Sequence, residues 1–299
     1  MITNLTPASA IFLANVNRLE QTLADANNEV SSGKKVNVAS DDPSQVQALL
    51  QLRTDEQQNA QIQSNLSMAT ADADTSDSAL SSAIQLMDRA VTLATQGANA
   101  TTDASGRQSI AQEIAGIQAE MVSISQTQVQ GRYVFSGDQE NSPAYQLDLN
   151  AATGVDELSD SAATREVQDP EGGTFTASET AQQIFDAPGA SVFAALNSLR
   201  LNLLANDQTG IGNALTAVQT ASAQLNTSEA FYGNVEDRIN DSNTFAGQYD
   251  TQLQTAISSI QDADAASAAL QLTQSNTALQ AAFQAEGKMP TTSLFNYLG

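Results

Sequence analysis

The chain combines 299 residues with a formal net charge of −23, from 11 basic and 34 acidic side chains. This charge argues against nucleic acid and anionic membrane surfaces as partners, because both would repel it. His and Cys are absent, which removes the usual transition-metal ligands, the commonest general base and any disulfide. An enzyme would have to work with carboxylates, Lys, Ser, Thr or Tyr.

The first expected element is a helix from about Pro7 to Ser32 that ends at Gly33. Its apolar residues recur at spacings of four and three, which places them on one stripe of a helix. The stripe consists of Phe12, Val16, Leu19, Leu23, Ala26 and Val30. A second helix should start after Asp42, a good N-cap, with Pro43 at its first position.

The chain then shows two long heptad-like patterns that predict a helical bundle. The first pattern comprises Ile62, Leu66, Ala69, Ala73, Ser76, Leu80, Ile84, Met87, Val91 and Ala94. A polar break from Gly97 to Gly106 follows. The same spacing resumes at Ile110, Ile114, Ile117, Met121 and Ile124. Helices with one apolar stripe each need partners, so these segments should pack together.

A change of period marks the segment from Gly131 to Gly137, which reads as a short strand or hairpin arm. Residues 138–190 then show no helical stripe and carry eleven acidic residues against one basic residue, Arg165. We predict a small, solvated, β-rich insertion here, with the seams of the bundle lying entirely outside it. Replacing it by a short linker should therefore leave a cooperative helical bundle.

Helical periodicity returns at Ser191 and continues to about Gln284. One helix should begin there, a second should span about Gly210 to Gln224, and a final long helix should run from about Ser228 to Gln284. The stripe of that final helix comprises Val235, Ile239, Ser242, Ala246, Tyr249, Leu253, Ala256, Ile260, Ala263, Ser267 and Leu270.

The two ends of the sequence carry apolar residues that the bundle does not need. Four of the six residues from Ser293 to Leu298 are large and apolar or aromatic, and such residues at an end require a partner to bury them. Paired with each other, the two ends would form only a helical hairpin with unsatisfied outer faces, so we expect them to mediate assembly. The candidate interface residues are Phe12, Val16, Leu19, Leu23, Val30, Leu270, Leu279, Phe283, Leu294, Phe295, Tyr297 and Leu298.

Two acidic groups could be taken for chemical sites. Asp41 and Asp42 form a carboxylate pair in a loop, which either serves acid–base chemistry or forms a turn and caps the next helix; the turn and cap explain both residues without further assumption. Asp72, Asp74 and Asp77 suggest a calcium loop, yet the Gly and the distal Glu of such a loop are absent and the segment is helical by period. We expect a solvated helix face there, and no catalytic, cofactor or metal site.

Several segments resemble the bacterial flagellin family over about residues 1–137 and 191–299. The stretch from Glu29 to Asn37, followed by Ser40-Asp41-Asp42-Pro43, looks like the family's Ser-Ser/Thr-Gly-Lys/Arg segment and Asp-Asp turn. The segment from Ile260 to Asp264 and the following Leu272-Thr273-Gln274 look like the family's C-terminal helix. The proline of Asp41-Asp42-Pro43, the segment from Gly131 to Gly137 and the ending Ser-Leu-Phe-Asn-Tyr-Leu favour the junction proteins of the family over filament flagellin.

The resemblance implies a mainly α fold, a long-helix bundle with coiled-coil-like paired termini and a small β-rich inserted domain. The inner, assembly-dependent helices would comprise residues 1–44 and 265–299, the bundle 45–137 and 191–264, and the outer domain 138–190. The implied function is structural: an adaptor ring at the hook–filament junction, with filament flagellin as the alternative.

The same resemblance implies the surroundings of the protein. Its partners would be copies of itself, a neighbouring hook-associated protein, flagellin and an export chaperone, with no cofactor. It also implies a location outside the cell, in the flagellum, after type III export without a cleaved signal. The segment from Met1 to Ala14 agrees with this, because it has no basic residue and no long apolar run.

Overall fold

The computed structural model describes residues 7–159 and 161–288, and within them it contains seven helices and three antiparallel strand pairs. The predicted fold class, mainly α with a small β-rich insertion, is confirmed. The elements in chain order are α1 (Pro7–Ser32), α2 (Pro43–Ala98), α3 (Ala104–Ser125), β1 (Gln128–Val129), β2 (Arg132–Tyr133), β3 (Tyr145–Leu147), β4 (Val155–Glu157), β5 (Glu166–Gln168), β6 (Thr174–Thr176), α4 (Ala181–Phe185), α5 (Val192–Leu204), α6 (Gln208–Gln261) and α7 (Ala265–Glu286).

The chain divides into two compact units. Unit 1 contains residues 1–58 and 249–299, and unit 2 contains residues 59–248. The long helices α2 and α6 contribute residues to both units. No helix among the described residues is both long enough and apolar enough to cross a membrane.

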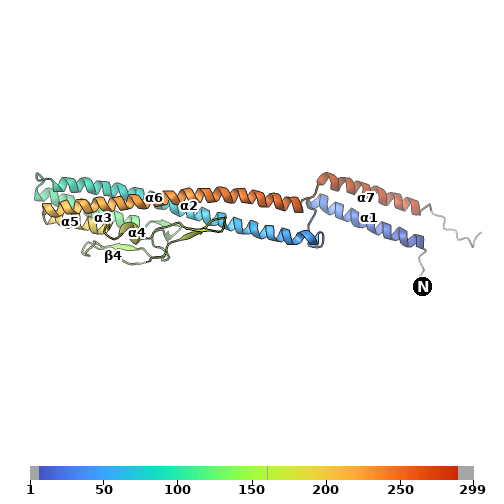
Figure 1. Ribbon diagram of the computed structural model, residues 1–299, viewed down its shortest axis with the longest axis horizontal. Helices are drawn as coiled ribbons and strands as arrows, with labels where there is room; N and C mark the ends of the chain where they lie inside the picture. Colours follow the sequence, from blue (N-terminus) through green and yellow to red (C-terminus); the bar gives the residue numbers. More distant parts are fainter. Residues whose placement is uncertain (1–6, 160, 289–299) are drawn as a thin grey trace, which may run out of the picture. The chain divides into compact units, whose positions relative to one another are not determined.

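Unit 2 is a helical bundle built from parts of α2 and α6 together with α3 and α5 (Figure 1). The predicted seams form its core: Leu66, Leu80, Met87, Ile114 and Met121 are fully buried. Ser191 caps α5 by accepting a hydrogen bond from the backbone N–H of Ala194, as expected for a helix that starts there. Sequence periodicity therefore located α2, α3 and α5 of the bundle.

A buried arginine closes the end of the bundle where α2 and α5 finish. The Arg107 side chain is almost entirely shielded from solvent. Its guanidinium donates to the carbonyl oxygens of Gly97 and Asn99 and to the side chain of Asn206. It thereby satisfies backbone acceptors that the end of α2 leaves open.

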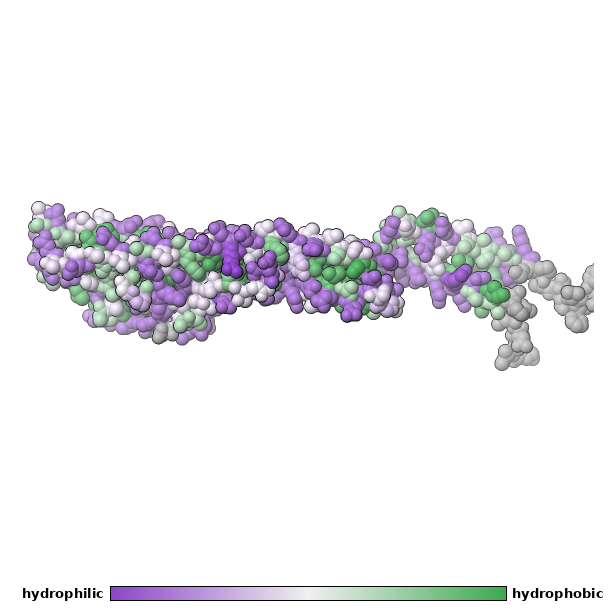
Figure 2. Space-filling view, in the orientation of Figure 1, coloured by the Kyte–Doolittle hydropathy of each residue, from purple (hydrophilic) through white to green (hydrophobic). Residues whose placement is uncertain are grey.

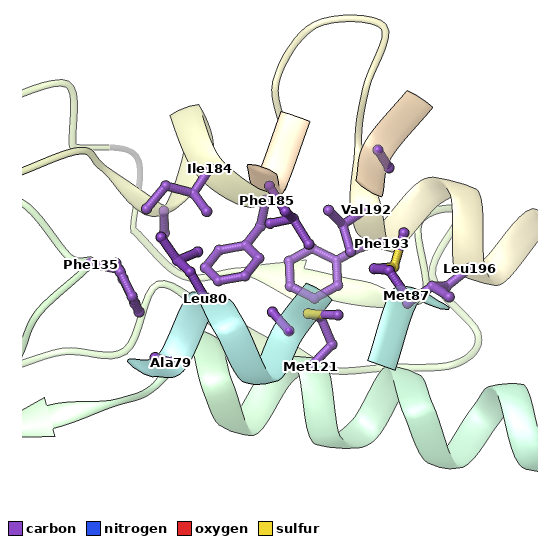
Figure 3. Packing of buried hydrophobic residues seen from close by; sticks show 14 of the residues in the cluster. Ala79, Leu80, Met87, Met121, Phe135, Ile184, Phe185, Val192, Phe193 and Leu196 are labelled. Carbon is purple, nitrogen blue, oxygen red and sulfur yellow. The ribbon is translucent and has the colours of Figure 1, made fainter. Parts of the chain in front are cut away.

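The prediction that the bundle's seams lie entirely outside residues 138–190 is wrong. Figure 3 shows Ile184 and Phe185 of α4 among the bundle's apolar side chains, and Phe185 is fully buried. Its ring centroid lies 5.6 Å from that of Phe135 and 5.9 Å from that of Phe193. Tyr145 of β3 approaches Phe193 to 4.8 Å between ring centroids. The insertion therefore supplies aromatic side chains to the same core as the helices.

Polar side chains of the bundle also hold the β3–β4 hairpin. Gln118 of α3 donates to the carbonyl oxygen of Thr153 at 3.0 Å. Asn197 of α5 donates to the carbonyl of Ala152 at 3.0 Å, and Arg200 to that of Leu149 at 2.8 Å. Because Gln118 and Asn197 are buried, these bonds fix the hairpin turn tightly against the helices.

The strand predicted between Gly131 and Gly137 is shorter than expected. Only Arg132 and Tyr133 pair, with β1, across a two-residue turn in which Gln130 and Gly131 have positive φ. Val134 still donates its backbone N–H to the carbonyl of Thr127 at 3.0 Å, and the side chains of Val134 and Phe135 enter the core. The insertion also contains one short helix that periodicity missed, α4, which Thr180 and Gln183 start with a capping box.

The predicted boundaries of the last helices are wrong as well. Residues 208–261 form one continuous helix, α6, and the break falls at residues 262–264 instead of 225–227. No Gly or Pro interrupts residues 225–227, and the Asn226 side chain bonds within the helix to the carbonyl of Ser222. Asp264 starts α7 as its N-cap, so the chain stops and restarts there.

Candidate assembly surface

Unit 1 is held together by a backbone clasp between the end of α6 and the segment that follows α1. The N–H groups of Lys35 and Val36 both donate to the carbonyl of Gln261, at 2.7 and 3.3 Å. In the opposite direction, Ala263 N–H donates to the carbonyl of Gly33 at 3.0 Å. Gly33 has φ +70°, a conformation that ends α1 and favours glycine.

Side chains strengthen this clasp. The Gln261 amide donates to the carbonyl of Val36 at 3.3 Å, and its oxygen accepts from Arg53 at 2.7 Å. Asp41 accepts from the N–H groups of Asn37 and Val38 at 2.8 and 2.9 Å. The loop residues are thus committed to local bonds, which orients α1 and α7 as neighbours.

The carboxylates of Asp42 and Asp264 act as helix caps. Asp42 accepts from the backbone N–H of Ser44 at 3.2 Å and from its hydroxyl at 2.6 Å, and the hydroxyl bond lowers the pKa of Asp42. Asp264 accepts from the hydroxyl of Ser267 at 2.9 Å, and that bond lowers the pKa of Asp264. The cap-and-turn interpretation of Asp41-Asp42 agrees with these bonds, because Asp42 caps α2 and Asp41 holds the preceding turn.

Helices α1 and α7 pack against each other in antiparallel fashion, with a backbone β-bridge between Lys34 and Asp262 at one end and Phe12 near Phe283 at the other. The two phenyl rings meet edge to face, with centroids 6.5 Å apart. Few residues of this seam are fully shielded. Those that are buried are Val16, Ala26, Ala268 and Ser275. A two-helix contact of this kind buries one side of each helix only.

Large apolar side chains are exposed on more than one side of the α1–α7 pair. Ile11 is 64% exposed, Leu270 60% and Phe283 52%, and Leu13 and Val30 are also exposed. Figure 2 shows hydrophobic residues on the surface of this pair. Covering a single Leu or Phe here would contribute about 1.5–3 kcal/mol. We call these five residues together the outer apolar face, although they do not all point to the same side of the pair.

The predicted interface residues fall into three groups. Phe12, Val16, Leu19, Leu23 and Leu279 are buried or half-buried within unit 1. Val30, Leu270 and Phe283 belong to the outer apolar face. Leu294, Phe295, Tyr297 and Leu298 lie outside the described residues.

The predicted stripe of the last helix has the wrong phase after residue 262. Ser267 and Leu270 were expected to point inward, yet Ala268 and Ser275 are buried and Leu270 faces outward. The break at residues 262–264 resets the helical phase. Asp264 followed by Ser267 was the signal for this restart, because a cap residue before a new apolar period marks a helix start.

Ile11 and Leu13 are the surface residues that periodicity missed. They flank Phe12 and lie off its stripe, so a search for one repeating stripe discards them. The continuous apolar run from Ala10 to Leu13 was the available signal, because a helix that is apolar on more than one side has more than one partner.

The three aspartates considered for calcium lie on one helix, α2, and serve different contacts. Asp72 pairs with Arg132 and Arg165, which join it to β2 and to the segment before β5. Asp74 and Asp77 lie close enough to Glu236 to raise its pKa, although burial of Glu236 is the larger cause. Among the described residues, no group of three or more acidic side chains is arranged to hold a metal ion.

Comparisons with known proteins identify both ends of the chain. Residues 3–140 match the model for the bacterial flagellin N-terminal helical region, and residues 215–298 match the model for the bacterial flagellin C-terminal helical region. The intervening residues, which include most of the insertion, match neither model. A search of curated proteins gave no match.

Solved structures with a similar fold include several flagellar proteins. The chain resembles a putative flagellar hook-associated protein from Vibrio parahaemolyticus at 20% identity and a TM-score of 0.65, covering 74% of this chain and 100% of that one. FlgL from Bacillus cereus gives 17% identity and a TM-score of 0.57, with 71% and 100% covered. Flagellar hook-associated protein 3 from Legionella pneumophila gives 13% identity and a TM-score of 0.63, with 72% and 99% covered.

These structural likenesses show a shared fold. The two matched family regions together include α1 and α7, which carry the outer apolar face, and the residues of the clasp. The arrangement offers helix caps, a helical core and uncovered apolar surface. The chain belongs to the bacterial flagellin family and is a structural, non-enzymatic protein of the bacterial flagellum.

Proposed function

We propose that this protein is the adaptor subunit of the hook–filament junction, where copies of it form a ring on which the filament assembles. The observation that carries the proposal is the outer apolar face, which α1 and α7 leave uncovered in a single copy. A ring of copies repeats the same contact at every subunit. Burial of apolar side chains between subunits then drives assembly without any chemical reaction.

The choice of the junction rests on sequence segments that resemble the junction proteins. Pro43 after the aspartate pair starts α2 in the structure, and the segment from Gly131 to Gly137 delivers Val134 and Phe135 into the core. The likeness in fold to FlgL and to hook-associated protein 3 agrees with this choice. The partners would be a neighbouring hook-associated protein on one side, flagellin on the other, and an export chaperone before assembly.

Filament flagellin is the second candidate, because the two matching family models are named for flagellin and do not distinguish the two roles. We further propose that residues 1–44 and 265–299 form the inner layer of the assembly. The bundle segments 45–137 and 191–264 would form the next layer, and residues 138–190 would face outward.

Copy number distinguishes the two functions. A ring requires few copies per flagellum, whereas a filament requires thousands. Quantitative mass spectrometry of isolated flagella, calibrated with labelled peptides of this protein and of the most abundant filament protein, measures this ratio. A ratio below about one in a hundred supports the junction, and a ratio near one makes the protein a filament subunit.

A further inference from the structure

A shallow groove runs between α1 and α7 within unit 1, with a volume of about 480 Å³. Leu270, which is 60% exposed, forms part of one wall and Leu19 part of the other. The full lining is Leu19, Thr22, Ser267, Leu270, Gln271, Gln274, Ser275 and Ala278. None of these side chains is charged, although 15% of the residues in the chain are.

This lining restricts what the groove can bind. An ionic partner would find no counter-charge there, and its desolvation would be unfavourable. Neutral hydroxyls and amides beside two leucines suit a segment that is apolar and uncharged, with a few polar groups. Burial of apolar area is then the main source of affinity.

The sequence contains one segment with this chemistry beyond α7. The eleven residues from Met289 to Gly299 include no charged side chain and contain the run Leu294, Phe295, Asn296, Tyr297 and Leu298. Leu294 and Leu298 are four residues apart, a spacing that puts both on one side of a helical turn. This short segment and the groove are matched in polarity and in lack of charge.

We propose that the segment from Leu294 to Leu298 of one copy binds the α1–α7 groove of a neighbouring copy. The proposal rests on the proposed function, because it requires copies to lie side by side. It names the partner of the groove: a helical turn from a second copy of this chain, with Leu294 and Leu298 against Leu19 and Leu270.

Chain length argues for the neighbouring copy over the same copy. Leu270 precedes Glu286 by sixteen residues of helix, or roughly 24 Å. Seven residues, 287–293, separate Glu286 from Leu294, and a reversal of direction takes about four of them. The remaining three cover at most about 11 Å, so a helical turn cannot reach Leu270 of its own chain.

Cysteine cross-linking tests this contact, because the natural chain has no cysteine. Cells make two versions together, one with Leu270→Cys and one with Phe295→Cys and a size tag. Isolated flagella are oxidised with a copper catalyst, and mixed dimers are measured on non-reducing gels. The control pairs Phe295→Cys with Ile11→Cys, which is 64% exposed on α1 but outside the groove.

We expect at least tenfold more mixed dimer from Leu270→Cys than from Ile11→Cys. If Leu270→Cys prevents incorporation, Leu19→Cys on the opposite wall replaces it, with the same expectation. Equal yields from groove and control positions overturn the proposal. So does a chain carrying both Leu270→Cys and Phe295→Cys that closes only within itself.

The result is separable from the proposed function. If mixed dimers form and the protein is as abundant as the filament subunit, the groove contact is supported and the junction role is refuted. A protein present at ring stoichiometry without mixed dimers would keep the junction role and refute the groove contact.

Discussion

Phe185→Ala is expected to destabilise unit 2 strongly, although the residue lies in the insertion and outside the bundle helices. The side chain is fully buried, and its ring packs between those of Phe135 and Phe193, with centroids at 5.6 and 5.9 Å. Truncating such a ring removes its transfer free energy and leaves a cavity, which costs about 3–5 kcal/mol. For a unit of this size the melting temperature falls by roughly 6–20 °C.

The assay is urea unfolding followed by circular dichroism at 222 nm, with equal slopes required for wild type and variant. Leu201→Ala is the matched control, because Leu201 lies in the same unit on α5 and is half exposed. It should cost less than about 1 kcal/mol. A loss for Phe185→Ala no larger than that of the control would refute the shared core. By the same reasoning, joining Gly137 to Ser191 through a linker should abolish the cooperative transition.

Three further changes test other contacts. Gly154→Ala should lower the stability of unit 2 in thermal melts, because Gly154 has φ +78° and an added Cβ would overlap the Gln118 amide; an unchanged melting temperature would contradict the tight hairpin docking. Burial and, to a lesser extent, Asp77 raise the pKa of Glu236 from its ordinary 4.5, so wild-type stability falls as pH rises from 4.5 through the higher folded-state pKa. Glu236→Gln should therefore melt above wild type at pH 7 and together with it near pH 4, and identical melts at pH 7 would rule this out. Asp264→Ala removes the N-cap of α7, which should cost about 0.5–2 kcal/mol. Hydrogen exchange should then show faster exchange of the α7 amides. Unchanged exchange would show that the cap is dispensable.

Helical periodicity predicted the bundle well because its helices bury one regular stripe each. Leu66, Leu80 and Met87 follow a heptad spacing and are fully buried. The restart at Asp42-Pro43 was also readable, because a cap residue followed by proline has few other uses. In these segments local propensity and tertiary packing agree.

Contacts of the insertion could not be predicted in the same way. Tyr145 and Phe185 enter the core from a three-residue strand and a five-residue helix, which are too short to show a period. Their acidic surroundings suggested a solvated segment, yet single aromatic residues decide the packing. Where such a residue packs depends on the whole core, so the sequence around it shows no periodic pattern that would predict the contact.

The assembly surface was partly readable. Apolar residues near both ends indicated pairing of α1 with α7, and the structure places Phe12 beside Phe283. The orientation of Leu270 was missed because the stripe was continued through the break at residues 262–264. Because the cap at Asp264 was missed, Leu270 was predicted to point inward, whereas it points outward.

Immunogold labelling of isolated flagella tests the central claim most directly. An antibody against residues 138–190, which lie outside both matched family regions for most of their length, avoids cross-reaction with other family members. We predict one narrow band of gold at the boundary between hook and filament. Decoration along the whole filament would contradict it and would make the protein a filament subunit.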